Sequence, residues 1–285
     1  MFSYRHAFHA GNHADVLKHV VVVQLLRHLA LKETPFWVID THAGAGLYQL
    51  DSEWANKRSE YLDGIARLWQ LSAVPAPVAD YLAVVRELNP DGELRHYPGS
   101  PFIALQHLRE RDRLNLSELH SSESQVLAQN IAAAGRDAQR RTRVDAADGF
   151  ERLRALLPPP PRRALILIDP PYENKDDYAL VVQAVREALT RFATGCYAIW
   201  YPRVQRREPQ EMISRLVAIP GLRWLHASLT VRSPSPEGPG LHGSGMFVIN
   251  PPWTLPSALA SCLPWLVDIL RQDEGANWTL DKGGL

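Results

Sequence analysis

The residues best suited to chemistry in this sequence are Asp169-Pro170-Pro171-Tyr172, which directly follow the apolar run 164–168. That run is short and rich in β-branched residues, which predicts a buried strand of a parallel sheet. The two prolines after it lack the N–H groups that would continue the strand. An acid, a rigid turn and an aromatic ring therefore lie at the carboxyl end of a central strand. In open α/β sheets, ligands bind at that edge.

The Asp-Pro-Pro-Tyr turn has the groups needed to hold a planar amine conjugated to a base ring. Proline keeps its carbonyl oxygen, so the Asp169 carboxylate and the Pro170 carbonyl can accept the two amine protons. Tyr172 can stack on an extruded base, a contact worth ~1–3 kcal/mol per base. Such a turn would orient an exocyclic amino group for attack on an activated methyl group. The alternative is an ordinary strand exit, because Asp-Pro is common in turns.

A second predicted strand, residues 36–40, also ends in an acid, Asp40. The loop 41–46 follows at once and contains Gly44 and Gly46, whose small size lets the backbone approach a ligand closely. The loop matches neither the dinucleotide-binding fingerprint nor a P-loop. It fits an amino acid joined to a nucleoside better than a triphosphate. A tight turn between strand and helix is the alternative.

Two more acids follow predicted strands. Residues 114–118 end at Glu118, and Rossmann-like folds hold a ribose diol with a carboxylate at this place. Asp148, Gly149 and Phe150 follow the next short strand, where an acid and an aromatic ring suit an adenine amino group and ring face. Asp148 could equally be an ordinary helix N-cap.

Composition limits the classes of protein that the chain can represent. It has 285 residues, of which 46% are hydrophobic, with 31 basic and 31 acidic residues and a formal net charge of zero. Contact with nucleic acid must therefore use local patches instead of a global field. Cys196 and Cys262 lie in apolar surroundings and predict no disulfide. The chain has no apolar run of ~18 residues and no leader pattern, so we expect a cytoplasmic protein without membrane contact. We also expect a monomer.

The first 13 residues interleave aromatic rings with arginine and histidine, a composition that suits nucleic-acid contact. The alternative is an amino-terminal segment that packs its aromatic side chains into a groove of the protein itself. A helix is predicted next, with Asn12 as its N-cap and Asp15 in its first turn. His13, His19 and His42 could suggest a metal site. Their spacing matches no zinc pattern, so we expect no metal.

The rest of the chain predicts an α/β protein with a doubly wound, mostly parallel sheet of Rossmann-like type, because strands alternate with helices. Residues 48–97 interrupt this alternation and predict a small helical subdomain, with helices over 60–71 and 78–88. Ser100 is the expected N-cap of the next helix. Residues 250–253 (Asn-Pro-Pro-Trp) echo the acidic turn without its acid and predict a structural strand exit. Residues 273–285 are expected to be loose.

Several motifs together resemble those of the RlmJ family, S-adenosylmethionine-dependent class I methyltransferases that methylate adenine N6 in 23S ribosomal RNA. The resemblance covers essentially the whole chain. Its motifs are residues 3–6 (SYRH), 8–19 (FHAGNHADVLKH), 40–46 (DTHAGAG), 97–101 (YPGSP) and 168–172 (IDPPY). The amino-terminal motif is far more specific than the glycine loop.

The resemblance implies roles for individual residues of this sequence. Catalysis would rest on Asp169, with Pro170 and Tyr172 seating the adenine, and Tyr4 would contact the RNA. S-adenosyl-L-methionine would be bound by Lys18, His19, His42, Ser100, Glu118, Asp148, Gly149 and Asp169. The implied partner is 23S ribosomal RNA. Adenine N6 is hardly basic, so orientation and desolvation are expected to matter more than prior deprotonation.

Three other functions remain open at the level of sequence. The first is a DNA adenine-N6 methyltransferase, which Asp-Pro-Pro-Tyr alone does not separate from an RNA enzyme. The second is an RNA-binding or assembly protein that keeps the cofactor pocket. The third is a metal-dependent hydrolase. Intact Asp169 and Tyr172 argue against the second.

Overall fold

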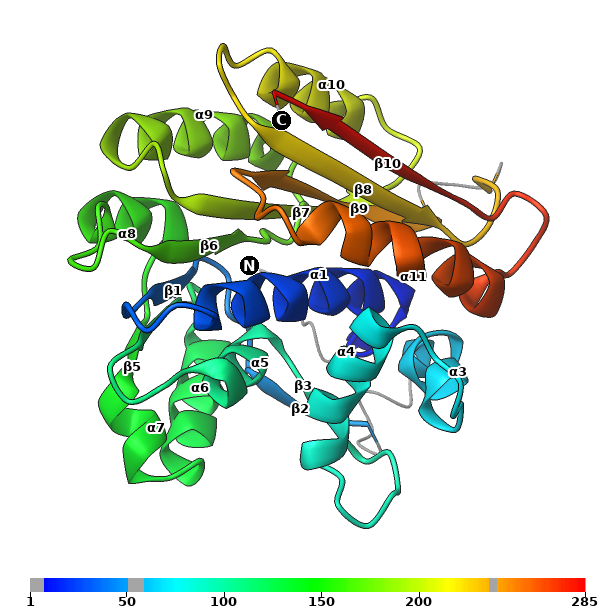
Figure 1. The fold of residues 1–285 in the computed structure, drawn as a ribbon, viewed down its shortest axis with the longest axis horizontal. Helices are drawn as coiled ribbons and strands as arrows, with labels where there is room; N and C mark the ends of the chain where they lie inside the picture. Colours follow the sequence, from blue (N-terminus) through cyan, green and yellow to red (C-terminus); the bar gives the residue numbers. More distant parts are fainter. Residues whose placement is uncertain (1–7, 51–58, 236–239, 285) are drawn as a thin grey trace.

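The computed structural model describes residues 8–50, 59–235 and 240–284. Within them, eight strands form one open sheet in the order β10-β8-β9-β7-β6-β1-β4-β5 (Figure 1). The strands are β1 (Trp37–Asp40), β4 (Arg113–Ser117), β5 (Thr142–Asp145), β6 (Ala164–Ile168), β7 (Cys196–Arg203), β8 (Trp224–Thr230), β9 (Gly243–Ile249) and β10 (Asn277–Gly283). Neighbouring strands from β5 to β7 are parallel, whereas β9 is antiparallel to β7 and β8. The predicted doubly wound, mostly parallel sheet is confirmed.

Strand β6 is the centre of the sheet, and all five of its residues are buried. Its apolar composition follows from this position, because both of its faces are covered by helices. Asp40 at the end of β1 is in register with Leu167 of β6 and with Leu116 of β4. The carboxyl ends of these three strands therefore lie side by side, and the acids that follow them share one edge.

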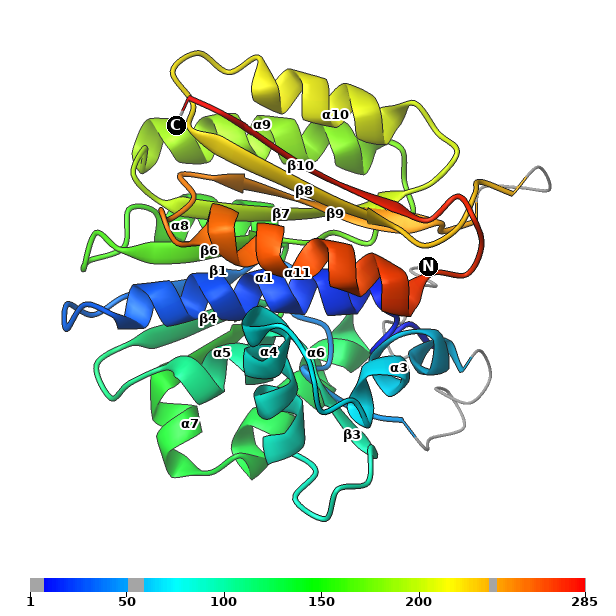
Figure 2. The same ribbon diagram turned by 45° about the vertical axis from the view of Figure 1, so that its right-hand side comes forward.

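Helices cover both faces of the sheet. One face carries α1 (His13–Ala30), α5 (Ser100–His107), α6 (Ser121–Ala133) and α11 (Leu255–Leu270), and the other α8 (Gly149–Leu156), α9 (Asp176–Arg191) and α10 (Glu208–Val217). The short helix α7 (Arg136–Arg141) precedes β5. In Figure 2, α1 and α11 run side by side across the sheet. None of the described helices has the length and apolarity to span a membrane.

The interruption after the first strand is present where the sequence placed it. Strands β2 (Leu47–Gln49) and β3 (His96–Pro98) pair at its base. Between them lie a 3₁₀ turn (Glu60–Asp63), α3 (Ile65–Trp69) and α4 (Ala76–Glu87). The helix expected over 60–71 is thus broken at Gly64, where a side chain would collide with the Gly11 carbonyl. Helix α4 packs on α1 and α11, and its assignment to a separate subdomain stays a prediction.

Two sequence predictions about segment ends are wrong. The N-cap of α5 is Gly99, because the Ser100 hydroxyl turns away to donate to Asp40 Oδ2 at 2.6 Å. Residues 277–283 are not loose but form β10, which pairs with β8 along seven residues. The backbone hydrogen bonds of β10 need only an available sheet edge, and its side-chain pattern is mostly exposed, so the hydrophobic pattern gave no signal.

Candidate active site

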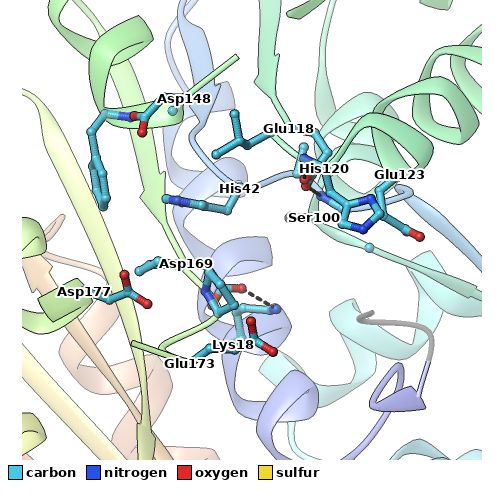
Figure 3. Close-up of a pocket in the computed structure, with 18 of the residues that line it drawn as sticks. Lys18, His42, Ser100, Glu118, His120, Glu123, Asp148, Asp169, Glu173 and Asp177 are labelled. Carbon is cyan, nitrogen blue, oxygen red and sulfur yellow. Dashed lines mark hydrogen bonds and ion pairs between the residues drawn. The ribbon is translucent and has the colours of Figure 1, made fainter. Parts of the chain in front are cut away.

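Helix α1 delivers a charged residue to the centre of the molecule. Its N-cap is Asn12, as predicted, whose side chain accepts from the N–H groups of Ala14 and Asp15. The first turns of the helix are buried on every side. The Lys18 ammonium lies 2.9 Å from Asp15 Oδ1 and 2.7 Å from Asp169 Oδ2. A residue from the start of the chain thereby meets the acid of the central turn, as the dashed line in Figure 3 shows.

The charges of this triad stabilise one another. Burial disfavours the ammonium of Lys18, but Asp15 and Asp169 outweigh that effect and raise the pKa of Lys18 above its ordinary value. Two carboxylates around one ammonium leave a net charge of about −1. The site can therefore offset positive charge that develops beside Asp169.

A cavity of about 330 Å³ opens at the carboxyl ends of the parallel strands. We call it the first cavity. It is lined by each residue to which the resemblance gave a cofactor contact, namely Lys18, His19, His42, Ser100, Glu118, Asp148, Gly149 and Asp169. Pro170 also lines it. The fold thus brings together residues that are far apart in sequence. They are 18–19, 42, 100, 118, 148–149 and 169.

Glu118 and Asp148 form two acidic walls of the first cavity (Figure 3). Glu118 accepts from the N–H groups of Gly44 and His120, both at 2.8 Å, and burial raises its pKa. The geometry fits a carboxylate that accepts hydroxyl protons from a ribose. Asp148 Oδ1 caps α8 by accepting from the N–H of Phe150 at 2.8 Å. The cap uses Oδ1 only, so Oδ2 of Asp148 can still accept a hydrogen bond from a ligand in the cavity.

Asp40 lies behind the cavity wall instead of in it. It is buried and accepts from Ser100 Oγ and from the His42 N–H, so it fixes two residues that do line the cavity. Burial raises the pKa of Asp40 to about 6. Burial likewise lowers the pKa of His42 to about 4, which leaves its imidazole neutral at pH 7. The His42 ring meets the Phe150 ring edge-on at 5.1 Å.

Two glycines of the first cavity lie where protein atoms approach too closely for a side chain. Gly44 has φ +58°, and a side chain there would collide with the Tyr48 hydroxyl. A Cβ on Gly149 would collide with the Thr41 carbonyl oxygen, so only glycine lets α8 start against the loop that follows β1. These close approaches bring backbone N–H groups and small surfaces to the place where a nucleoside would lie.

A second cavity of about 220 Å³ adjoins the first. Lys18, Asp169 and Pro171 line both cavities and form the wall between them. The second cavity is otherwise lined mainly by aromatic and apolar groups, among them Tyr172, Tyr178, Trp200, Pro202, Val204 and Leu241, with Arg206. Asp169 therefore borders both cavities.

Tyr172 lies in the second cavity and not in the first. It is buried, with φ +52°, and its hydroxyl donates to the Trp200 carbonyl oxygen at 2.6 Å. Its ring centroid lies 4.5 Å from that of Tyr178. Stacking of Tyr172 on an acceptor base stays a prediction. Tyr4 lies outside the described residues.

Some cavity residues carried no signal in the sequence. Trp200 lies inside β7 and Tyr178 inside α9, where each looks like an ordinary core aromatic. His120 and Glu123 lie at the start of α6. Of the three histidines considered for a metal, His19 instead bonds the Tyr97 hydroxyl through Nδ1 at 2.8 Å. The described residues contain no group of three or more His, Cys, Asp or Glu that could hold a metal ion.

Three features define the class I methyltransferase fold. The strands have the order given above, β9 lies antiparallel between β7 and β8, and the cavity opens at the carboxyl ends of β1, β4 and β6. Residues 33–281 match the family model described as "Ribosomal RNA large subunit methyltransferase D, RlmJ". The chain belongs to the RlmJ family of ribosomal RNA methyltransferases.

Similar proteins agree with this assignment. Ribosomal RNA large subunit methyltransferase J of Escherichia coli is 51% identical over 266 residues, which is 93% of each chain. The protein of the same name from Haemophilus influenzae is 46% identical over 282 residues, 99% of this chain and 98% of its own. The crystal structure of a Legionella pneumophila protein is 33% identical with a TM-score of 0.86, and covers 96% of this chain and 98% of its own.

Proposed function

We propose that this chain transfers the methyl group of S-adenosylmethionine to N6 of an adenine in large-subunit (23S) ribosomal RNA. The observation that carries the proposal is the position of Asp169, paired with Lys18 in the wall between two cavities. A methyl transfer needs the acceptor nitrogen in line with the methyl carbon and its leaving sulfur, so both ligands must meet beside the group that orients the amine. The named relatives are ribosomal RNA large subunit methyltransferases, which supports the choice of substrate.

The first cavity has the donor set that S-adenosylmethionine requires. Glu118 would accept from the ribose hydroxyls and Asp148 from the adenine amino group, with Phe150 against that ring. Gly44 and Gly149 both line this cavity, and at each position the packing of neighbouring protein atoms requires glycine. The cofactor would supply an activated methyl group, whose bond to sulfur breaks as the acceptor nitrogen bonds to its carbon, and S-adenosylhomocysteine would be the leaving product.

The second cavity would take the acceptor adenine, extruded from the RNA. Lys18 holds Oδ2 of Asp169, so the other carboxylate oxygen can accept one proton of the N6 amine. The Pro170 carbonyl would accept the other proton. Both bonds orient the amine, and the net negative triad of Asp15, Lys18 and Asp169 offsets the positive charge that forms on nitrogen as the bond to carbon is made. The proton then leaves through Asp169 or water.

The test is methyl transfer from labelled S-adenosylmethionine to unmodified 23S ribosomal RNA, followed by nucleoside analysis. We expect N6-methyladenosine with the wild type and a roughly 10²–10⁴-fold loss with Asp169→Ala, because the orienting carboxylate is removed. Asp281→Ala, at an exposed position of β10, is the matched control and should keep full activity. Duplex DNA as the preferred acceptor would refute the RNA substrate, and full activity of Asp169→Ala would refute the mechanism.

We further propose that the enzyme acts in the cytoplasm as a monomer. The ribosomal RNA substrate supports the location. The described residues of one chain line both cavities, which supports the monomer. Sedimentation of the purified protein at the concentration of the activity assay tests the second point, and a dimer under those conditions would contradict it.

A further inference from the structure

We propose that Arg206 and Tyr178 bind a phosphate of the RNA backbone beside the acceptor adenine. This inference rests on the proposed function, since it takes the second cavity as the acceptor site. It assigns the part of that cavity that Arg206 and Tyr178 line. Both residues line the second cavity and only Asp169, Lys18 and Pro171 are shared with the first.

Tyr178 carries a polar group that the described protein leaves unused. Its side chain is 3% exposed, yet its hydroxyl has no hydrogen-bond partner in the described residues. A buried hydroxyl without a partner costs free energy, and an acceptor oxygen of a ligand in the second cavity would satisfy it. The ring is held against Tyr172, so the hydroxyl has a fixed place.

Arg206 supplies a positive charge at the same cavity. Its side chain is half-buried, and its guanidinium forms no ion pair with a described carboxylate. Glu208, two residues on, pairs with Lys175 at 3.4 Å, and the charge of Arg206 also acts on it. The charge of Arg206 reaches Tyr178, because it opposes the rise in pKa that burial causes at that phenol. A phenol O–H and a guanidinium in one cavity form a donor set for an anion.

The lining of the cavity next to Asp169 has a different character. There Lys18 lies 5.7 Å from the centre of the Trp200 ring, and its two acids leave the triad a net charge of about −1. This part repels a phosphate and suits a planar, uncharged base. An adenine placed there continues through its ribose to a phosphodiester, and the phosphate is the anion that an extruded nucleotide must bring with it. Arginine with a hydroxyl donor is a common phosphate contact in nucleic-acid complexes.

The experiment measures binding of unmodified 23S ribosomal RNA by filter retention over a salt titration, together with KM for RNA and the Kd of S-adenosylmethionine. Arg206→Ala should weaken RNA binding roughly 5–30-fold and lower the slope of log K against log salt by about 1. Arg206→Lys should recover part of the affinity because it keeps the charge. Arg111→Ala is the matched control, since Arg111 is exposed at the opposite edge of the sheet.

Tyr178→Phe separates a binding role from a structural one. The hydroxyl makes no hydrogen bond in the described protein, so its removal should leave the melting temperature unchanged or higher. The affinity for RNA should still fall roughly 3–10-fold. A lower melting temperature with unchanged RNA binding would overturn the assignment of Tyr178.

The outcomes also separate this inference from the proposed function. If the wild type methylates RNA but Arg206→Ala has the RNA affinity and salt slope of Arg111→Ala, the phosphate site is refuted and the methyltransferase is not. If Arg206→Ala weakens S-adenosylmethionine as much as RNA, Arg206 supports the cofactor cavity and the inference fails. If the wild type methylates no RNA, the proposed function itself fails.

Discussion

Replacement of Lys18 by methionine should destabilise the fold and abolish methyl transfer for separable reasons. Lys18 contacts Asp15 and Asp169 at 2.9 and 2.7 Å, and the three side chains are 5%, 3% and 13% exposed. Methionine fills a similar volume but leaves two buried carboxylates without their cation. Breaking a buried pair in this way costs about 3–5 kcal/mol. We take the lower end, ~3 kcal/mol, because Asp169 is partly exposed in the cavity wall.

Thermal unfolding measures the first effect. For a chain of this size, ~3 kcal/mol corresponds to a fall in melting temperature of about 6–12 °C. The double variant Lys18→Met/Asp15→Asn has the same net charge at the site as the wild type, since one cation and one anion are removed together. It should recover at least half of the lost stability. It should not recover methyl transfer, because Asp169 still lacks the ammonium that holds Oδ2.

Two results would refute this reasoning. A melting temperature of Lys18→Met within 1–2 °C of the wild type would mean that water screens the triad and that its burial has little energetic effect. Recovery of methyl transfer in the double variant would mean that Lys18 acts only on stability. In that case the orienting role of Asp169 does not depend on its ion pair.

Three further predictions test the support of the first cavity. Tyr97→Phe removes the hydroxyl that bonds His19 and should weaken S-adenosylmethionine binding roughly fivefold in calorimetry, with kcat little changed. Burial raises the pKa of Asp40 to about 6 in the folded protein. The unfolded chain loses this proton at a lower pH, so the free energy of unfolding falls as pH rises from about 4 to about 6. Asp40→Asn should remove up to ~3 kcal/mol of that dependence in denaturant titrations at the two pH values. Gly149→Ala should lower the melting temperature through its collision with the Thr41 carbonyl, whereas helix propensity alone predicts a rise.

The sequence predicted the acids and the sheet because both depend on local patterns. Short apolar runs ended by Asp40, Glu118 and Asp169 define strand ends directly. Parallel pairing then brings such ends to one edge without further information. The contact between Lys18 and Asp169 spans 151 residues and depends on how α1 packs across the sheet. Only the resemblance to a known family pointed to Lys18.

Strand direction explains why two similar turns have different roles. Residues 169–172 and 250–253 both place two prolines after a buried strand. β9 is antiparallel to β7, so its end lies at the opposite edge of the sheet from the cavities. There Asn250 donates to the carbonyl oxygens of Ala193 and Gly195, a structural role in line with the strand exit predicted from the sequence. Composition alone does not give the direction of a strand.

The second cavity was not predictable for a different reason. Its walls come from the interior of β7 and α9, and the periodic pattern of those elements is satisfied whether a residue packs on protein or faces a cavity. The distinguishing sign is a polar atom left without a partner, at Tyr178 and at Trp200 Nε1. An unpartnered polar atom is visible in the structure but not in the sequence.

Strand β10 has a consequence for how the protein avoids self-association. It occupies the edge of the sheet and pairs with β8 along its whole length. An uncovered β8 would present a seven-residue row of hydrogen-bonding groups to any other chain, the template from which fibrils and domain-swapped dimers grow. β10 replaces that row with an edge whose side chains include Asp281 and Lys282, and charged residues discourage further pairing. The carboxyl-terminal strand lines neither cavity. Its effect is to keep the edge of β8 from pairing with another chain.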